Sequence, residues 1–398
     1  MRKSLGNFFH ELELYEDIHS GNRYKKDIAE AVFNFLKKNN ESNAYKVYTS
    51  FFNAYWIGIQ HPDNPFLKLQ DTLRKFEENA GRLIDKQRDH YVHSVNVFIL
   101  GLAIYANNAK YRQLFNSYAL NADYPDHYST RHEEFFYRWG LASLFHDIAY
   151  PLEITLKQAN QYFDFVWSYP KTTKVKNKSF IDFPNFNKFI SLPCLTPSRR
   201  FSLSFYQKYP QFSSLKKCNA IDLLAYLISG SLGLKQGDLL RSIDSFAADM
   251  KRGGFIDHGF YSAVIMLKWY HFLLKITKWN PAYFFYPILD SSSAILLHNF
   301  YGKVLMKKPF RLRALSASRH PIAFLLILCD ELQEWNRQPY GSHEPRMIAV
   351  NKIKLSFKLH SLKLTYVGEA STITQVFKRA SINYKELFKN GIIIRGGE

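Results

Sequence analysis

Residues 132–151 read HEEFFYRWGLASLFHDIAYP, and this stretch determines the fold that we predict. Its apolar residues recur three and four positions apart and cover most of the helix circumference, which is typical of a helix buried inside a bundle. The pair His146-Asp147 closes the apolar run. Pro151 disfavours helical backbone angles in the residue before it, so the helix should end here. Side chains of adjacent residues diverge by about 100° on a helix, but at its end both can turn towards one ion.

Three further stretches have the same apolar character. They are residues 90–108 (HYVHSVNVFILGLAIYANN), 258–277 (HGFYSAVIMLKWYHFLLKIT) and 321–337 (PIAFLLILCDELQEWNR). Asp257 can cap the second of them, and Pro321 suits the first turn of the third. The chain is rich in aromatic residues, with 34 Phe and 26 Tyr, and has only 18 Gly and 15 Pro. Together these features predict a mainly α fold.

The rest of the chain suggests three parts around these helices. Residues 1–84 carry amphipathic helical patterns and predict a helical N-terminal subdomain. Residues 85–340 hold the strong helices and are interrupted at about 151–254 by a weaker pattern, which we interpret as an insertion, with a lid as one reading of it. In residues 341–398 the alternation of KIKLSFKLHSLKLTYV predicts a β-hairpin, and TITQVFKRASINYKELFKN predicts a helix after it.

Charge and cysteine usage limit the partners and the compartment. Lys and Arg outnumber Asp and Glu by 53 to 34, a formal charge of +19, so the surface should attract nucleotides, nucleic acid or other anions. The three cysteines are widely separated and lack zinc or disulfide spacing, which favours a reducing compartment. The first residues lack an apolar signal core, and the apolar runs are too short to span a bilayer. We therefore expect a cytoplasmic protein with no membrane partner.

Two polar residues on other predicted helices need a partner. His93 lies at the start of the helix predicted at 90–108, and Asp330 lies inside the apolar run IAFLLILCDELQEW. Burying a carboxylate is unfavourable unless it is paired or bound to a metal. A metal ion shared with His146 and Asp147 would satisfy both residues. The ordinary alternative for an isolated His-Asp pair is a capping aspartate beside a hydrogen-bonded histidine.

The ordered set of His93, His146-Asp147 and Asp330 resembles the signature of the HD superfamily of metal-dependent phosphohydrolases. In that family a His, a His-Asp pair and a distant Asp come from different helices of one bundle. The resemblance covers roughly residues 85–337, and the three-part motif in order is moderately specific. It implies an HD-domain helical bundle that binds a divalent metal.

Two further histidines resemble the extra ligands of binuclear members of the family. His258 opens a predicted helix and His298 closes an apolar run, so the resemblance implies six ligands for one or two ions (Mn, Fe, Mg or Zn) bridged by Asp147. The alternatives are a helix-start histidine that binds no metal for His258, and a histidine bonded to a backbone carbonyl for His298. Asn299 departs from the cyclic-dinucleotide branch, which has a further histidine there.

The resemblance implies a metal-activated water that attacks phosphorus, and hence a phosphohydrolase or phosphodiesterase of a nucleotide or nucleotide-derived phosphate ester. Asp147 and Arg88 would be the catalytic residues. Arg88 and Arg319 would bind the substrate phosphate, although each can also be an ordinary surface charge. Expected partners are a nucleotide or another phosphorylated small molecule, with nucleic acid as a further candidate, and the sequence is compatible with an oligomer.

Two other functions fit the same ligands. Oxygenases similar to myo-inositol oxygenase use the same order of ligands around two irons, and the sequence does not distinguish them from hydrolases. A degenerate HD bundle that binds a nucleotide or nucleic acid through its basic surface, without catalysis, is the third hypothesis.

Overall fold

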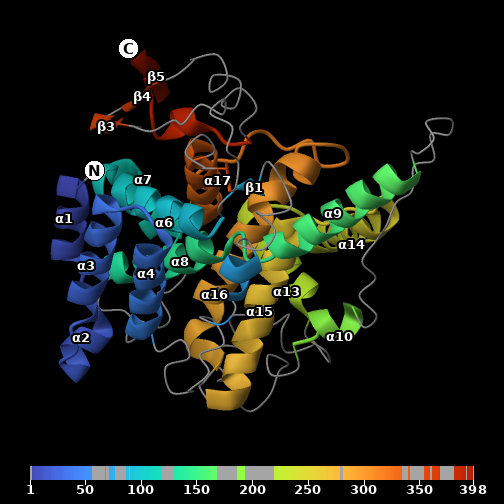
Figure 1. The fold of residues 1–398 in the computed structure, drawn as a ribbon, viewed down its shortest axis with the longest axis horizontal. Coiled ribbons are helices and arrows are strands. Elements are labelled where there is room, and N and C mark those ends of the chain that lie inside the picture. Colours follow the sequence, from blue (N-terminus) through green and yellow to red (C-terminus); the bar gives the residue numbers. More distant parts are fainter. Residues whose placement is uncertain are drawn as a thin grey trace.

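The computed structural model describes residues 2–55, 68, 71–76, 87–88, 90–118, 130–167, 186–192, 219–277, 281–333, 339–340, 354–358, 361–367, 381–390 and 392–397. Helices dominate these residues, and strands are confined to short segments (Figure 1). The prediction of a mainly α fold is confirmed. No helix in this part of the chain is long and apolar enough to cross a membrane.

Four N-terminal helices form one side of the molecule (Figure 1). They are α1 (Arg2–Glu11), α2 (Tyr15–Ser20), α3 (Tyr24–Lys37) and α4 (Glu41–Ala54). They share a core with the helices that follow, because the ring of Phe51 lies 6.0 Å from that of Phe98 and 5.5 Å from that of Phe136. The helices before and after the predicted domain boundary at residue 84 thus share one hydrophobic core.

A bundle of long apolar helices occupies the centre. Its members are α6 (His90–Asn107), α8 (Arg131–Phe145), α15 (His258–Thr277), α16 (Pro281–Phe300) and α17 (Pro321–Gln333), and α16 packs against α8, α15 and α17. Helices α6 and α8 approach closely at Gly101, where a Cβ atom would lie 2.0 Å from the ring of Trp139. The indole of Trp139 donates a hydrogen bond of 2.8 Å to the carbonyl of Phe98. This contact joins the middle of α6 to the middle of α8.

The helix ends follow the signals in the sequence. Helix α15 begins at His258, and the carboxylate of Asp257 accepts a 2.9 Å hydrogen bond from the backbone N–H of Phe260 as a cap. Helix α17 begins at Pro321. Helix α8 ends at Phe145, earlier than the end predicted from Pro151; residues 146–149 form a turn, and the next helix begins at Tyr150, directly before that proline. The ends of these helices therefore carry the polar residues singled out above.

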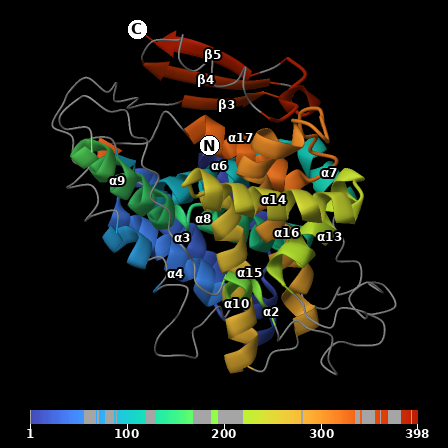
Figure 2. The same cartoon turned by 90° about the vertical axis from the view of Figure 1, so that its right-hand side faces the viewer.

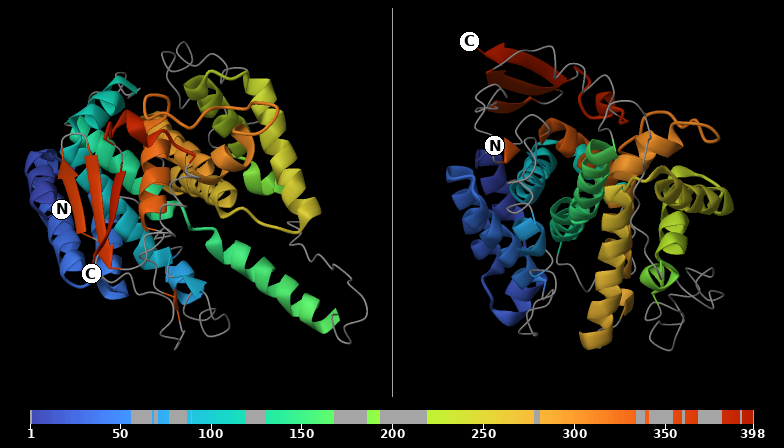
Figure 3. Two further views of the ribbon diagram at one scale, coloured as in Figure 1. Left: turned by 90° about the horizontal axis from the view of Figure 1, so that it is seen from above. Right: turned by 45° about the vertical axis from the view of Figure 1, so that its right-hand side comes forward.

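The segment predicted as an insertion contains further helices. They are α9 (Tyr150–Trp167), which projects from the body in Figure 3, α10 (Phe186–Ile190), α13 (Ala220–Leu232) and α14 (Gln236–Gly253). Helix α13 packs against α15 and α16 and buries Leu223, Leu224 and Leu227. Asn219 caps α13 by accepting from the N–H of Asp222 at 2.9 Å. This later part of the predicted insertion is core structure, which makes it unsuited to act as a lid.

The C-terminal segment forms a small sheet above the helices (Figure 2). Strands β3 (Lys354–Lys358) and β4 (Ser361–Val367) make the antiparallel hairpin that the alternation predicts, and β5 (Ile392–Gly397) adds a parallel third strand. A second, two-stranded sheet pairs β1 (Gln87–Arg88) with β2 (Pro339–Tyr340).

The helix predicted after the hairpin is wrong over residues 381–390, the part of it that the structure describes. These residues contain only the 3-10 turn η6 (Tyr384–Glu386). Tertiary hydrogen bonds pair residues 381–383 with Leu315, which donates to the carbonyl of Ser381 at 2.7 Å and accepts from the N–H of Asn383 at 2.8 Å. This pairing outweighs the local helical pattern.

Candidate metal centre

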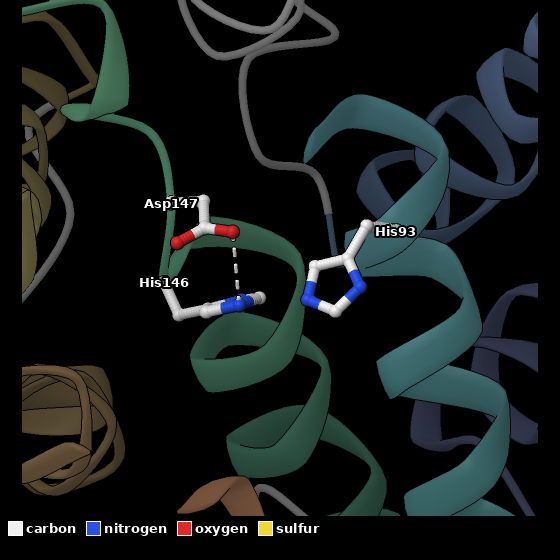
Figure 4. Close-up of side chains that lie close together, drawn as sticks. All are labelled: His93, His146 and Asp147. Atoms are coloured by element: carbon white, nitrogen blue, oxygen red, sulfur yellow. Dashed lines mark ion pairs between the residues drawn. The ribbon is translucent and has the colours of Figure 1, made fainter. Parts of the chain in front are cut away.

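Three predicted ligands form a buried group between α6 and α8 (Figure 4). His93 comes from the first turn of α6, and His146 and Asp147 come from the turn after α8. Ligand atoms of these three residues lie within 4.8 Å of one another, and Nε2 of His146 is 3.2 Å from Oδ2 of Asp147. None of the three is more than 3 % exposed. Because the helix has ended at Phe145, the adjacent side chains of the pair can face the same point.

Asp330 lies beside this group. Its Oδ1 is 2.9 Å from Nε2 of His93 and 3.8 Å from Nε2 of His146. The side chain is 25 % exposed, more than the apolar sequence around it predicts, because it lies in the last turn of α17, near the surface. Asp330 is thus placed either to orient the ring of His93 or to serve as a further ligand of an ion held by His93, His146 and Asp147.

A second group shares Asp147 with the first. Oδ1 of Asp147 is 3.4 Å from Nε2 of His258 at the start of α15. That nitrogen is 3.2 Å from Nε2 of His298 near the end of α16. Ligand atoms of these three residues also lie within 4.8 Å of one another. The structure therefore brings all six predicted ligands together, with one oxygen of Asp147 directed to each group.

Hydrogen bonds fix which nitrogen of three of the histidines faces the centre. In each ring Nδ1 is bonded to a group that accepts a hydrogen, so Nδ1 carries a proton, and in the neutral ring Nε2 carries the lone pair. The acceptors are the carbonyl of Ser143 for His146 (2.9 Å), the carbonyl of Ile295 for His298, and Oε2 of Glu153 for His258 (2.6 Å). Such outer bonds are the usual means of orienting metal-binding imidazoles.

The donor atoms fit a metal ion. Nε2 of His146 and Oδ2 of Asp147 are buried and have no hydrogen-bond partner. Nε2 of His258 and Nε2 of His298 face each other at 3.2 Å, and a cation beside them would relieve the repulsion between their lone pairs. With metal–ligand bonds of about 2.1 Å, neighbouring ligands of one ion lie about 3.0–3.4 Å apart. The separations of 3.2 and 3.4 Å at Asp147 fall in this range.

The charges of the ligands also suit a cation. Burial raises the pKa of Asp147, but the imidazole of His146 outweighs it and holds the carboxyl pKa well below its usual range. Burial lowers the pKa of His298 to about 4, so this ring stays neutral. Burial opposes charge on His146, yet Asp147 and then Asp330 raise its pKa to about 10. A metal ion would displace that proton, so binding should release protons and weaken in acid.

Sequence reasoning missed the residues that support His258. The backbone N–H of His258 lies 3.3 Å from the carboxylate of Glu153 that also holds its ring, and Nδ2 of Asn299 is 3.0 Å from its Nε2. Lys303 pairs with the capping Asp257 at 2.6 Å. The ring of His90 stacks on Tyr150 with centroids 3.4 Å apart. The only signal for Glu153 is an acidic residue in the first turn of α9, six positions after Asp147.

The two arginines that we predicted to bind phosphate lie in different parts of the structure. Arg88 lies in β1 directly before α6, so its backbone is near the centre, and its side chain is outside the described part of the structure. Arg319 precedes α17, and nine residues, about 13 Å of helix, separate Pro321 from Asp330. Arg319 therefore lies at the opposite end of α17 from Asp330, and the structure does not bring it to the metal centre. In the sequence Arg319 stands close to the helix that carries Asp330, but Asp330 lies at the other end of that helix.

Comparison with protein-family models, curated proteins and solved structures finds no match for the chain. The centre is accordingly defined by its own geometry, as two buried His/Asp groups joined by Asp147 that could hold a metal ion.

Proposed function

We propose that the chain is a metal-dependent phosphohydrolase that cleaves a phosphate ester of a nucleotide or nucleotide-derived molecule. The observation that carries this proposal is Asp147, whose two oxygens face two separate histidine groups at 3.2 and 3.4 Å. A carboxylate shared in this way is suited to hold two cations close together, as two-metal phosphoesterases do. The resemblance of the ordered ligands to the HD superfamily points to the same reaction class.

Different residues of the chain would bind the metal, orient its ligands and contact the substrate. A divalent cation bound here would supply Lewis acidity and lower the pKa of a water molecule. His146, His258 and His298 would offer neutral nitrogens held by their outer hydrogen bonds, and the buried walls would keep bulk water away. Arg88 remains our candidate for a phosphate contact because β1 leads directly into α6. The formal charge of +19 favours an anionic substrate.

A nucleotide panel tests the proposal. Purified protein with Mn²⁺ would be assayed on dNTPs, NTPs, cyclic nucleotides and dinucleoside phosphates, and we expect release of phosphate or a nucleoside monophosphate from at least one of them. Asp147→Ala should abolish this activity, because it removes the group common to both ligand sets. Asp249→Ala, at an exposed position on α14, is the matched control and should retain it. Turnover that survives Asp147→Ala would contradict the assignment.

Metal analysis separates this proposal from the other two functions. Tightly bound iron after anaerobic purification, with no phosphate release, would instead support an oxygenase on the same ligands. Salt-sensitive binding of nucleic acid without turnover of any nucleotide would instead support a binding module. One or two equivalents of Mn²⁺ together with phosphate release would support the hydrolase.

A further inference from the structure

A cavity of about 680 Å³ lies away from the metal centre, between α7 (Ala109–Tyr118), α13, α16 and the segment before α17. No metal ligand lines it. Its walls include Tyr118, Tyr226, Gly230, Ser231, Tyr286 and Arg319. The volume falls in the range of small-molecule sites, about 300–1,000 Å³.

The walls favour a flat ring. Three of the lining residues are tyrosines from three different helices, and aromatic faces stack on rings and other flat groups. Gly230 and Ser231, about one turn after Tyr226 on α13, leave room, since a Cβ atom added at Gly230 would meet nothing within 4 Å. A planar group could therefore enter beside α13 and lie against the tyrosine rings.

One wall is already fixed in place. The hydroxyl of Tyr118 donates a 2.9 Å hydrogen bond to Asp290, and its ring stacks on His320 with centroids 5.5 Å apart. Asp290 is itself held at 3.0 Å by the guanidinium of Arg138, and both of these charged residues are at most 1 % exposed. Because Tyr118 need not be ordered when a ligand binds, less affinity is lost to restricting its motion.

Arg319 supplies a cation at the rim. It is exposed, and within the described part of the chain no carboxylate pairs with it. Its Nη1 lies 3.5 Å from where a Cβ atom of Gly233 would be, so the guanidinium reaches across to the end of α13. An unpaired guanidinium offers parallel N–H donors that match a phosphate or carboxylate group.

We propose that this cavity is a second binding site, for a small molecule that joins a flat ring to a phosphate or carboxylate group. The ring would lie against the tyrosines beside Gly230, and the anionic group would pair with Arg319. The site does not depend on the hydrolase function proposed above, because it shares no residue with the metal centre.

Calorimetric binding to the full chain tests the proposal. The probes would be nucleoside monophosphates and aromatic carboxylates, with the free nucleosides and inorganic phosphate as single-feature controls. We expect saturable binding of at least one ring-bearing anion, and weaker binding of both controls. Arg319→Gln should weaken binding about tenfold or more, because a charge-assisted contact is lost. Arg313→Gln, an exposed arginine of the same segment that does not line the cavity, is the matched control and should have no effect.

A blocking variant locates the site. Gly230→Leu places a side chain in the open space beside the cavity and should abolish binding, while thermal unfolding of the variant reports that it folds. Asp147→Ala should bind the same probe as well as the unchanged protein does. The proposal is overturned if no probe binds saturably, if Gly230→Leu binds normally, or if Asp147→Ala loses the binding. The last result would place the ligand at the metal centre.

Discussion

Removing the carboxylate of Glu153 should weaken the second metal group selectively. Glu153 accepts the Nδ1 hydrogen of His258 at 2.6 Å and also receives its backbone N–H at 3.3 Å, so it fixes both the tautomer and the position of that ligand. Loss of an outer partner of this kind typically costs 10–100-fold in metal affinity. Glu153 is 35 % exposed, and water can partly replace it, so we expect about tenfold for Glu153→Ala. Glu153→Gln keeps a neutral acceptor and should lose less.

The measurement is a titration of metal-free protein with Co²⁺, followed by absorption, together with metal content by mass spectrometry after dialysis. Glu153→Ala should bind one ion as the unchanged protein does and the second about tenfold more weakly. Glu30→Gln, at an exposed position on α3, is the matched control and should leave both affinities unchanged. Equal loss of both ions, or no loss of either, would refute the assignment of Glu153 to His258 alone.

Three further outcomes follow from the packing. Mn²⁺ at a hundred times its dissociation constant should stabilise the protein by about 2.7 kcal/mol in denaturant unfolding, and Asp147→Ala should lose this gain. Gly259→Ala would place a Cβ atom 2.8 Å from the ring of His298, so the second ion should bind roughly tenfold more weakly or worse, while Gly237→Ala, whose nearest neighbour is 3.9 Å away, should bind normally. Arg138→Met leaves the buried carboxylate of Asp290 without its arginine and leaves Glu134 paired with Arg131 alone, so it should lower the unfolding free energy by about 3–5 kcal/mol; a loss under 1 kcal/mol would show that the network is solvated.

Local patterns in the sequence were enough to predict four of the five bundle helices, all but α16. The helix predicted at 258–277 has those bounds in the structure, and its capping residue makes the expected bond. Periodicity and capping depend on neighbours within one or two turns, so they can be read without the fold. The six ligands could be proposed because their order and flanking residues resemble a family, and their proximity is a property of the folded bundle.

Other features depend on contacts between distant segments. The residues at 381–390 lose their helical pattern to pairing with Leu315, and α13 belongs to the core only because α15 and α16 cover it. Arg319 lies before a predicted helix, and only the direction of that helix shows that it is far from Asp330. Glu153 has no spacing that distinguishes it from any acidic residue in a first turn. All four features depend on tertiary contacts, which the periodicity of the sequence does not reveal.

A cation at the centre would satisfy atoms that a single proton leaves unpaired. A single proton between His258 and His298 would satisfy their facing nitrogens, and although burial opposes charge on His258, Glu153 and Asp147 raise its pKa. That proton would still leave Nε2 of His146 and Oδ2 of Asp147 buried without hydrogen-bond partners. A second proton, on His146, would be needed to join its Nε2 to Oδ2 of Asp147 as an ion pair. Cations beside Asp147 would instead engage every one of these atoms with the tautomers that the outer hydrogen bonds already impose.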